Sequence, residues 1–236
     1  MRAFFVLILW SFVCLGASAL PRKQMIVTSH PLATEAGAEM LKRGGSAVDA
    51  AIAAQLVMGL VEPQSSGLGG GAFLLHWNPK HKRIETYDGR ETAPMAATPE
   101  LFLKSDGTPM GFVEAVVGGR SVGAPGAMAM LEMAHQEHGV LPWADLFGPA
   151  LNLAEDGFPV SKRLAAAIAG DPALAMIPAS AAYFRPNGMA LSEGQIVKNP
   201  DYAATLRALR EQGAKAMREG PLAQAIVDAV RNAPFN

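Results

Sequence analysis

Apolar positions in the first part of the chain recur at helical spacing. The pattern predicts a helix over Pro31–Arg43, which ends in basic residues followed by Gly44-Gly45. Cations in a last turn and a glycine after it are typical of a helix end. Ser46 and Asp49 then have the spacing of a capping box for a second helix. That helix, AVDAAIAAQLVMGLV, is apolar almost all round, which predicts that it is buried.

The pattern then changes to that of strands. The segments AFLLHW and RIETYDG flank Asn78-Pro79-Lys80, and apolar segments on either side of turn residues predict a β-hairpin. Further helices are expected at Ala127–His138, from Leu141 through Leu153, at Asp201–Gln212 and at Pro221–Arg231. The stretch from Pro178 to Pro200 contains several breakers and is expected to be a long loop. No linker divides residues 20–236, so we expect one domain there.

The N-terminus has the pattern of a signal peptide. Arg2 precedes an apolar run from Ala3 to about Leu15, and Ala17-Ser18-Ala19 follows as a cleavage site. We therefore expect residues 1–19 to be a signal peptide rather than a buried helix, and the protein to be exported to the periplasm or the extracellular space. Cleavage would remove Cys14, the single cysteine, so no disulfide is expected. No second hydrophobic segment predicts a membrane anchor after cleavage.

Composition narrows the function classes. Hydrophobic residues make up 50% of the 236 residues and charged residues 17%, which excludes a disordered chain. The net charge is −1 without a basic block, so we expect no nucleic-acid partner.

A glycine cluster, Gly67-Leu68-Gly69-Gly70-Gly71-Ala72, matches the dinucleotide-binding pattern by its letters. That motif functions between a strand and a following helix, whereas here the expected order is helix, glycines, strand. We interpret the cluster as a place where the backbone needs a positive φ or a close neighbour.

Histidines and arginines offer few other motifs. His135 and His138 lie three apart beside Glu132, but no third metal ligand is evident, so a solvated helix end is favoured; His30, His76 and His81 form no motif. We expect no metal and no cofactor. By spacing alone, Arg90 is more readily a surface ion-pair partner of Asp88 or Glu91 than a carboxylate-binding residue. The chain has no G-x-S-x-G element.

Six segments, in order, resemble the γ-glutamyltranspeptidase (glutathione hydrolase) family. They are GGSAVDAAIAA from Gly44, EPQSSGLGGGAF from Glu62, DGRETAP from Asp88, GAPGAM from Gly123, LPWADLFGPALNLAEDGFPVS from Leu141 and AATLRAL from Ala203. The resemblance implies an α/β (α+β) fold, the αββα sandwich of N-terminal-nucleophile hydrolases. It also implies a precursor that cuts itself, so that a new N-terminal threonine becomes the nucleophile with its own amine as base. The implied substrates are glutathione or other γ-glutamyl compounds, and the acceptors are water or amino acids.

The resemblance changes the interpretation of Arg90. In the family, the arginine of the DGRETAP motif holds the α-carboxylate of the glutamyl group, and by motif match this is Arg90. Arg90 followed by Glu91 favours an amino-acid-like substrate. The glycine cluster takes an architectural role in this interpretation.

The family's threonine pair lies beyond the matching part of the sequence. The chain therefore resembles only the front part of the large subunit, and we expect no catalytic residue in it, an incomplete sandwich and no activity without the small subunit. Ala72 and Met217-Arg218 are smaller departures. The alternatives are a cephalosporin-type acylase of the same fold, a non-catalytic exported fragment that binds a carboxylate ligand, and a fragment that does not fold stably.

Overall fold

The computed structural model describes residues 24–235, so the expected signal peptide lies outside the described residues. Helices dominate, and the described part of the chain contains two small antiparallel sheets of two strands each. The helices are α1 Pro31–Lys42, α2 Ala47–Val61, α3 Phe112–Val116, α4 Ala127–His138, α5 Gly148–Asp156, α6 Lys162–Gly170, α7 Pro178–Phe184, α8 Pro200–Gln212 and α9 Gly220–Arg231. The strands are β1 Phe73–Asn78, β2 Arg83–Asp88, β3 Phe158–Pro159 and β4 Ile196–Val197. Within residues 24–235, no helix combines the length and the apolarity needed to cross a bilayer.

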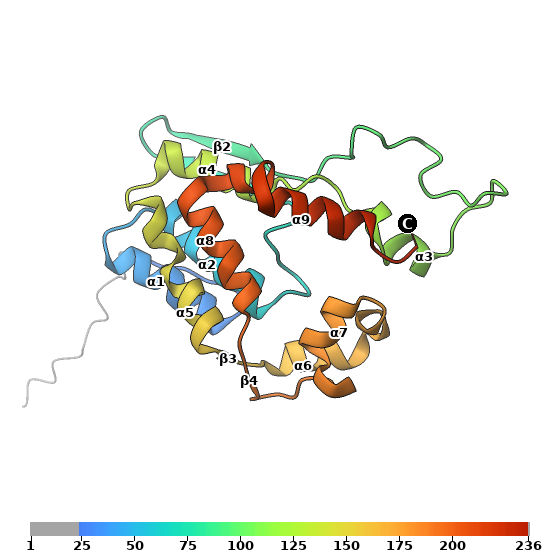
Figure 1. Ribbon diagram of the computed structural model, residues 1–236. Coiled ribbons are helices and arrows are strands. Elements are labelled where there is room, and N and C mark those ends of the chain that lie inside the picture. Colours follow the sequence, from blue (N-terminus) through green and yellow to red (C-terminus); the bar gives the residue numbers. More distant parts are fainter. Residues whose placement is uncertain (1–23, 236) are drawn as a thin grey trace, which may run out of the picture.

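Helix α2 is the centre of the core, as its apolar sequence predicts. It contacts α1, α4 and α5, and α8 reaches it through the Tyr202 hydroxyl, which donates to the Leu56 carbonyl at 2.8 Å. Figure 1 shows α2 enclosed by these helices. The expected capping box is present, since Ser46 Oγ accepts from the Asp49 N–H and Asp49 accepts from the Ser46 N–H.

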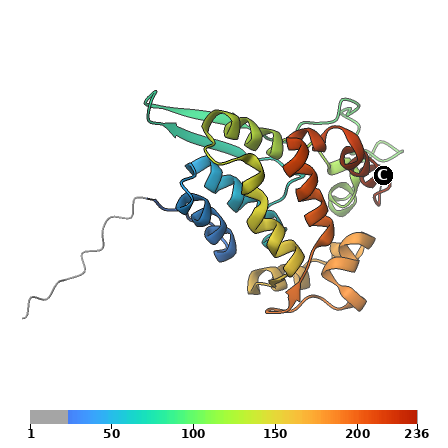
Figure 2. The ribbon, with the colours of Figure 1, turned by 60° about the vertical axis from the view of Figure 1, so that its left-hand side comes forward.

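Strands β1 and β2 form the predicted hairpin, in a register that pairs His76 with Glu85. Residues Leu74 and Tyr87 on one face belong to the core or pack against it. The other face is open, and Figure 2 shows the hairpin reaching past the helices at one edge. Four large apolar side chains lie on this outer face, each at least 58% exposed: Phe73, Leu75, Trp77 and Ile84.

Two expectations for the second half are wrong. The segment from Leu141 to Leu153 is not one helix, because a 3₁₀ turn over Trp143–Phe147 precedes α5. Pro149 lies in the first turn of α5. The N–H groups of a first turn have no partner within the helix, so the missing N–H of proline costs nothing there and favours the start of a new helix. The stretch 178–200 is not a simple loop, because it contains α7 and the strand β4. With α6, which lies outside the helices expected from the sequence, these elements form a small lobe below the core (Figure 1).

Candidate functional site

Arg90 lies two residues beyond the end of strand β2, where three backbone segments meet. Gly89 exchanges hydrogen bonds with Ala72, at 3.0 and 3.2 Å. A Cβ on Gly71 would lie 2.7 Å from the Arg90 Cα. On the other side, a Cβ on Gly126 would lie 2.8 Å from the Arg90 carbonyl oxygen. The glycine cluster is therefore a site of close backbone approach, and none of its glycines has a positive φ.

The Arg90 side chain is exposed and has no hydrogen-bond or ion-pair partner among the described residues. Its neighbour Asp88 accepts a hydrogen bond from the Arg90 backbone N–H at 2.9 Å instead. The surface ion pair that spacing alone favours is thus absent from the described structure.

Arg90 lines a cavity of about 570 Å³. The amphipathic helix α9 contributes Ile226 and Val227 to its apolar wall, and Arg218 and Arg231 also line it. Neither of these two arginines has an ion pair within residues 24–235. A cavity lined by three arginines and an apolar wall suits an anionic ligand that has an aliphatic chain, because guanidinium binds carboxylates through paired hydrogen bonds.

Glu91 faces away from this cavity. Its carboxylate lies against the glycine turn, where a Cβ on Gly71 would be 2.5 Å from Glu91 Oε2. Glu91 lines a separate cavity of about 450 Å³ beside Gln55 and Ser66. The adjacent residues Arg90 and Glu91 therefore line two different cavities.

The end of helix α4 is not a solvated helix end. The side chain of His135 is 15% exposed, its Nε2 lies 2.9 Å from the Leu141 carbonyl oxygen, and its ring packs edge-on against Trp143. The side chain of His138 is 12% exposed. Sequence reasoning placed both rings in water because it had no means of predicting what packs on α4.

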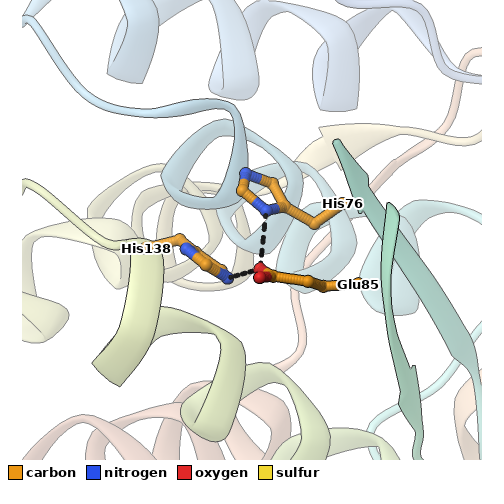
Figure 3. Close-up of side chains that lie close together, drawn as sticks. All are labelled: His76, Glu85 and His138. Carbon is orange, nitrogen blue, oxygen red and sulfur yellow. Dashed lines mark ion pairs between the residues drawn. The ribbon is translucent and has the colours of Figure 1, made fainter. Parts of the chain in front are cut away.

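His138 meets two hairpin residues that had formed no motif in sequence. His76 from β1, Glu85 from β2 and His138 from α4 point toward one another (Figure 3). They are the one group of three or more possible metal ligands found within residues 24–235. The predicted hairpin places His76 and Glu85 on neighbouring strands, and the register in the structure places them opposite each other.

Hydrogen bonds hold Glu85 of this cluster in its charged form, and burial with hydrogen bonding holds the adjacent Tyr87 in its neutral form. Asn78 Nδ2 donates to both oxygens of Glu85 at 3.2 Å, and these bonds, together with Arg83, hold the pKa of Glu85 below its usual range. The Tyr87 hydroxyl donates to Glu137 Oε2 at 2.7 Å and lies 2.7 Å from His138 Nε2. Burial, followed by the nearby Glu137 carboxylate, raises the pKa of Tyr87 to about 12, so the phenol stays neutral.

The sequence profile described as Gamma-glutamyltranspeptidase matches residues 33–234 of this chain. The chain belongs to the γ-glutamyltranspeptidase family. Among its relatives, the "Glutathione hydrolase proenzyme" of Bacillus subtilis (strain 168) is 39% identical over 208 residues, which are 88% of this chain and 35% of that protein. The "Acylase ACY 1 proenzyme" of Pseudomonas sp. (strain V22) is 36% identical over 226 residues, or 92% of this chain and 40% of that protein.

A solved structure confirms the fold of this family member. The γ-glutamyltranspeptidase of Helicobacter pylori superimposes with a TM-score of 0.83 at 30% identity, over 89% of this chain and 60% of that one. The fold is thus that of the γ-glutamyltranspeptidases, with the central sandwich incomplete in the described residues. The chain spans about a third of the length of the Bacillus subtilis relative.

Proposed function

We propose that this chain is part of an exported enzyme that cleaves γ-glutamyl amides, glutathione among them, and transfers the glutamyl group to water or to amino acids. The observation that carries the proposal is Arg90, which lines a cavity and whose side chain has no partner within residues 24–235, in a segment that matches the family. The backbone of Arg90 packs closely between Gly71 and Gly126, so the position of its Cα, from which the side chain extends, is well defined. Export is proposed from the signal-peptide pattern of residues 1–19.

In this proposal Arg90 holds the α-carboxylate of the substrate through two parallel hydrogen bonds. Three carbon atoms separate that carboxylate from the γ-carbonyl, so fixing one end orients the other for attack. The nucleophile is a threonine elsewhere in the precursor, whose own amine takes its proton. The amine product leaves, and water or an acceptor amine then attacks the acyl-enzyme.

The outer face of the hairpin supports the existence of a partner. A contiguous apolar face marks an interaction surface on a folded protein, and Phe73, Leu75, Trp77 and Ile84 present such a face. The relatives are longer than this chain, and the names of the Bacillus subtilis and Pseudomonas relatives include "proenzyme". We propose that the remainder of the same precursor, the small subunit included, covers this face, and that the chain alone is inactive.

The acylase relative supports a second candidate, hydrolysis of a glutaryl side chain. A glutaryl group is a glutamyl group without its α-amine, so the same arginine can hold the carboxylate of either one. An acidic group near Arg90 would distinguish them by binding the amine, but Glu91 faces the other cavity. We propose that residues outside this chain make that choice.

The test is the purified natural protein, characterised by intact mass and N-terminal sequencing and assayed with a γ-glutamyl anilide and its glutaryl analogue. Loss of hydrogen bonds to a charged group costs about 1.5–3 kcal/mol. We therefore expect Arg90→Gln to lower kcat/KM by roughly 10- to 150-fold, mainly through KM. The matched control is Arg207→Gln, because Arg207 forms a surface ion pair with Glu155 and is not among the residues that line the cavity. An unchanged KM in Arg90→Gln would refute the role of Arg90, and preferred turnover of the glutaryl substrate would favour the acylase.

A further inference from the structure

The group of His76, Glu85 and His138 lies between the inner face of the hairpin and the end of helix α4 (Figure 3). His76 and Glu85 are directly opposite each other in the antiparallel register. His138 is the last residue of α4. Three secondary-structure elements thus each supply one side chain of a type that binds metals.

The spacing of the three side chains fits one ion. His76 Nδ1 lies 3.7 Å and His138 Nε2 lies 3.1 Å from Glu85 Oε2, and one ligand atom from each residue lies within 4.8 Å of the other two. For a triangle with sides of 3.7, 3.1 and at most 4.8 Å, the equidistant point is at most about 2.4 Å from each corner. Zinc–nitrogen and zinc–oxygen bonds are about 2.0–2.2 Å long, so the three atoms lie close to bonding distance from one common point.

The surroundings prepare these groups to act as ligands. The side chains of His76, Glu85 and His138 are 18%, 14% and 12% exposed, which leaves a path for an ion and for water. Asn78 and Arg83 orient the Glu85 carboxylate, as outer hydrogen-bond partners do in metal sites. The buried Nδ1 of His76 has no hydrogen-bond partner in the described part of the chain, an unusual state for a buried polar atom.

We propose that His76, Glu85 and His138 form a binding site for a divalent transition-metal ion of the Zn²⁺ class, with a fourth position open to water. Two imidazoles and one carboxylate are a zinc ligand set, whereas Ca²⁺ and Mg²⁺ require oxygen ligands. The two imidazole rings are stacked with centroids 3.9 Å apart, so on binding they turn until both nitrogen lone pairs face the ion. His138 Nε2 then leaves the Tyr87 hydroxyl, which keeps its bond to Glu137.

Such an ion would fasten the hairpin to the helical core. The inference is independent of the proposed γ-glutamyl chemistry, because Arg90 lies beyond the end of β2 and shares none of these ligands. Since the ion binds the folded protein, it raises the stability in proportion to the logarithm of its concentration over Kd.

The experiment uses the intact natural protein, treated with a chelator, dialysed and titrated with Zn²⁺ near neutral pH. We expect one ion per chain, and at 100 times Kd a rise in Tm of about 5–10 °C. Glu85→Gln and His138→Gln should each weaken binding by at least about 100-fold, whereas outer partners affect it by about 10- to 100-fold. The matched control is His81→Gln, because His81 is exposed on the turn of the same hairpin and should bind as the natural protein does.

Several results would overturn the proposal. These are the absence of a stoichiometric ion in the natural protein, a Tm unchanged by Zn²⁺, or variants that bind as tightly as the natural protein. Should a variant fail to fold, Co²⁺ bound to the natural protein provides a separate measurement. A visible spectrum of four- or five-coordinate cobalt with histidine ligands supports the site, and a spectrum of fully hydrated cobalt contradicts it.

Discussion

Asp49 is a buried carboxylate that joins two segments of the core, and its removal tests how that core is held. Its side chain is fully buried. Its Oδ2 accepts hydrogen bonds from the backbone N–H groups of Ser46, Val140 and Leu141, at 2.7, 3.0 and 3.1 Å. Asp49→Ala therefore removes half of the capping box at the start of helix α2. It also removes the bonds that hold the chain after α4 against that helix.

The size of the effect follows from these three bonds. A hydrogen bond to a charged group contributes about 1.5–3 kcal/mol, and an unsatisfied buried donor costs a similar amount. Val140 is 66% exposed, so water replaces part of the loss there. We expect Asp49→Ala to lower the free energy of unfolding by about 3–5 kcal/mol, the range for a broken buried charge network. In a domain of this size that is a fall in Tm of roughly 6–20 °C.

Thermal unfolding followed by circular dichroism, together with urea titration, measures this change. The control is Ser46→Ala, which removes only the hydroxyl that accepts from the Asp49 N–H at 3.1 Å. Loss of such a cap costs about 1 kcal/mol. If Asp49→Ala destabilises the protein no more than Ser46→Ala does, the carboxylate does not hold the two segments together and the reasoning is wrong.

Two further predictions concern pH and backbone packing. His30 accepts a hydrogen bond from the Leu32 N–H at the start of α1, and burial holds the pKa of His30 below its ordinary value. The folded protein therefore favours the neutral imidazole. The contribution of His30 to the free energy of unfolding is complete above about pH 6.5 and is lost as the pH falls below that value. His30→Asn, which keeps a capping side chain, should flatten that slope in urea titrations at stepped pH, and an unchanged slope would contradict it. Gly126→Ala should cost about 1–3 kcal/mol by overpacking and raise KM by displacing Arg90, whereas Gly67→Ala, with nothing within 4 Å, should change neither unfolding nor kinetics.

The sequence predicted best the elements whose ends are determined locally. Helix α4 has the expected bounds, and α1, α8 and α9 differ from expectation by one residue at one end. Their caps and apolar spacing lie within a few residues, so no distant contact is needed to place them. Helix α6 also had a local signal that was missed, because Ser161 Oγ accepts from the Leu164 N–H at 3.0 Å and Ile168 continues the apolar face.

The failures required packing between elements. Helix α7 has seven residues, too few to be stable without packing, and it packs against the 3₁₀ turn over Pro172–Ala175. At the candidate sites, the resemblance singled out Arg90, but only the structure shows its cavity and the separation from Glu91. His76 and Glu85 lie on the two strands of the predicted hairpin, whereas His138 joins them through the docking of α4, which no local pattern predicts.

The central position of α2 has a consequence for the order in which the protein folds. Asp49 on this helix bonds to residues 91 and 92 positions later, and Leu56 to a residue 146 positions later. During synthesis, α2 leaves the ribosome long before α8 can cover it. Because contacts so distant in sequence form slowly, the helix waits with its apolar surface exposed, a state prone to aggregation. The protein therefore depends on protection of α2 until residues beyond 200 have been made.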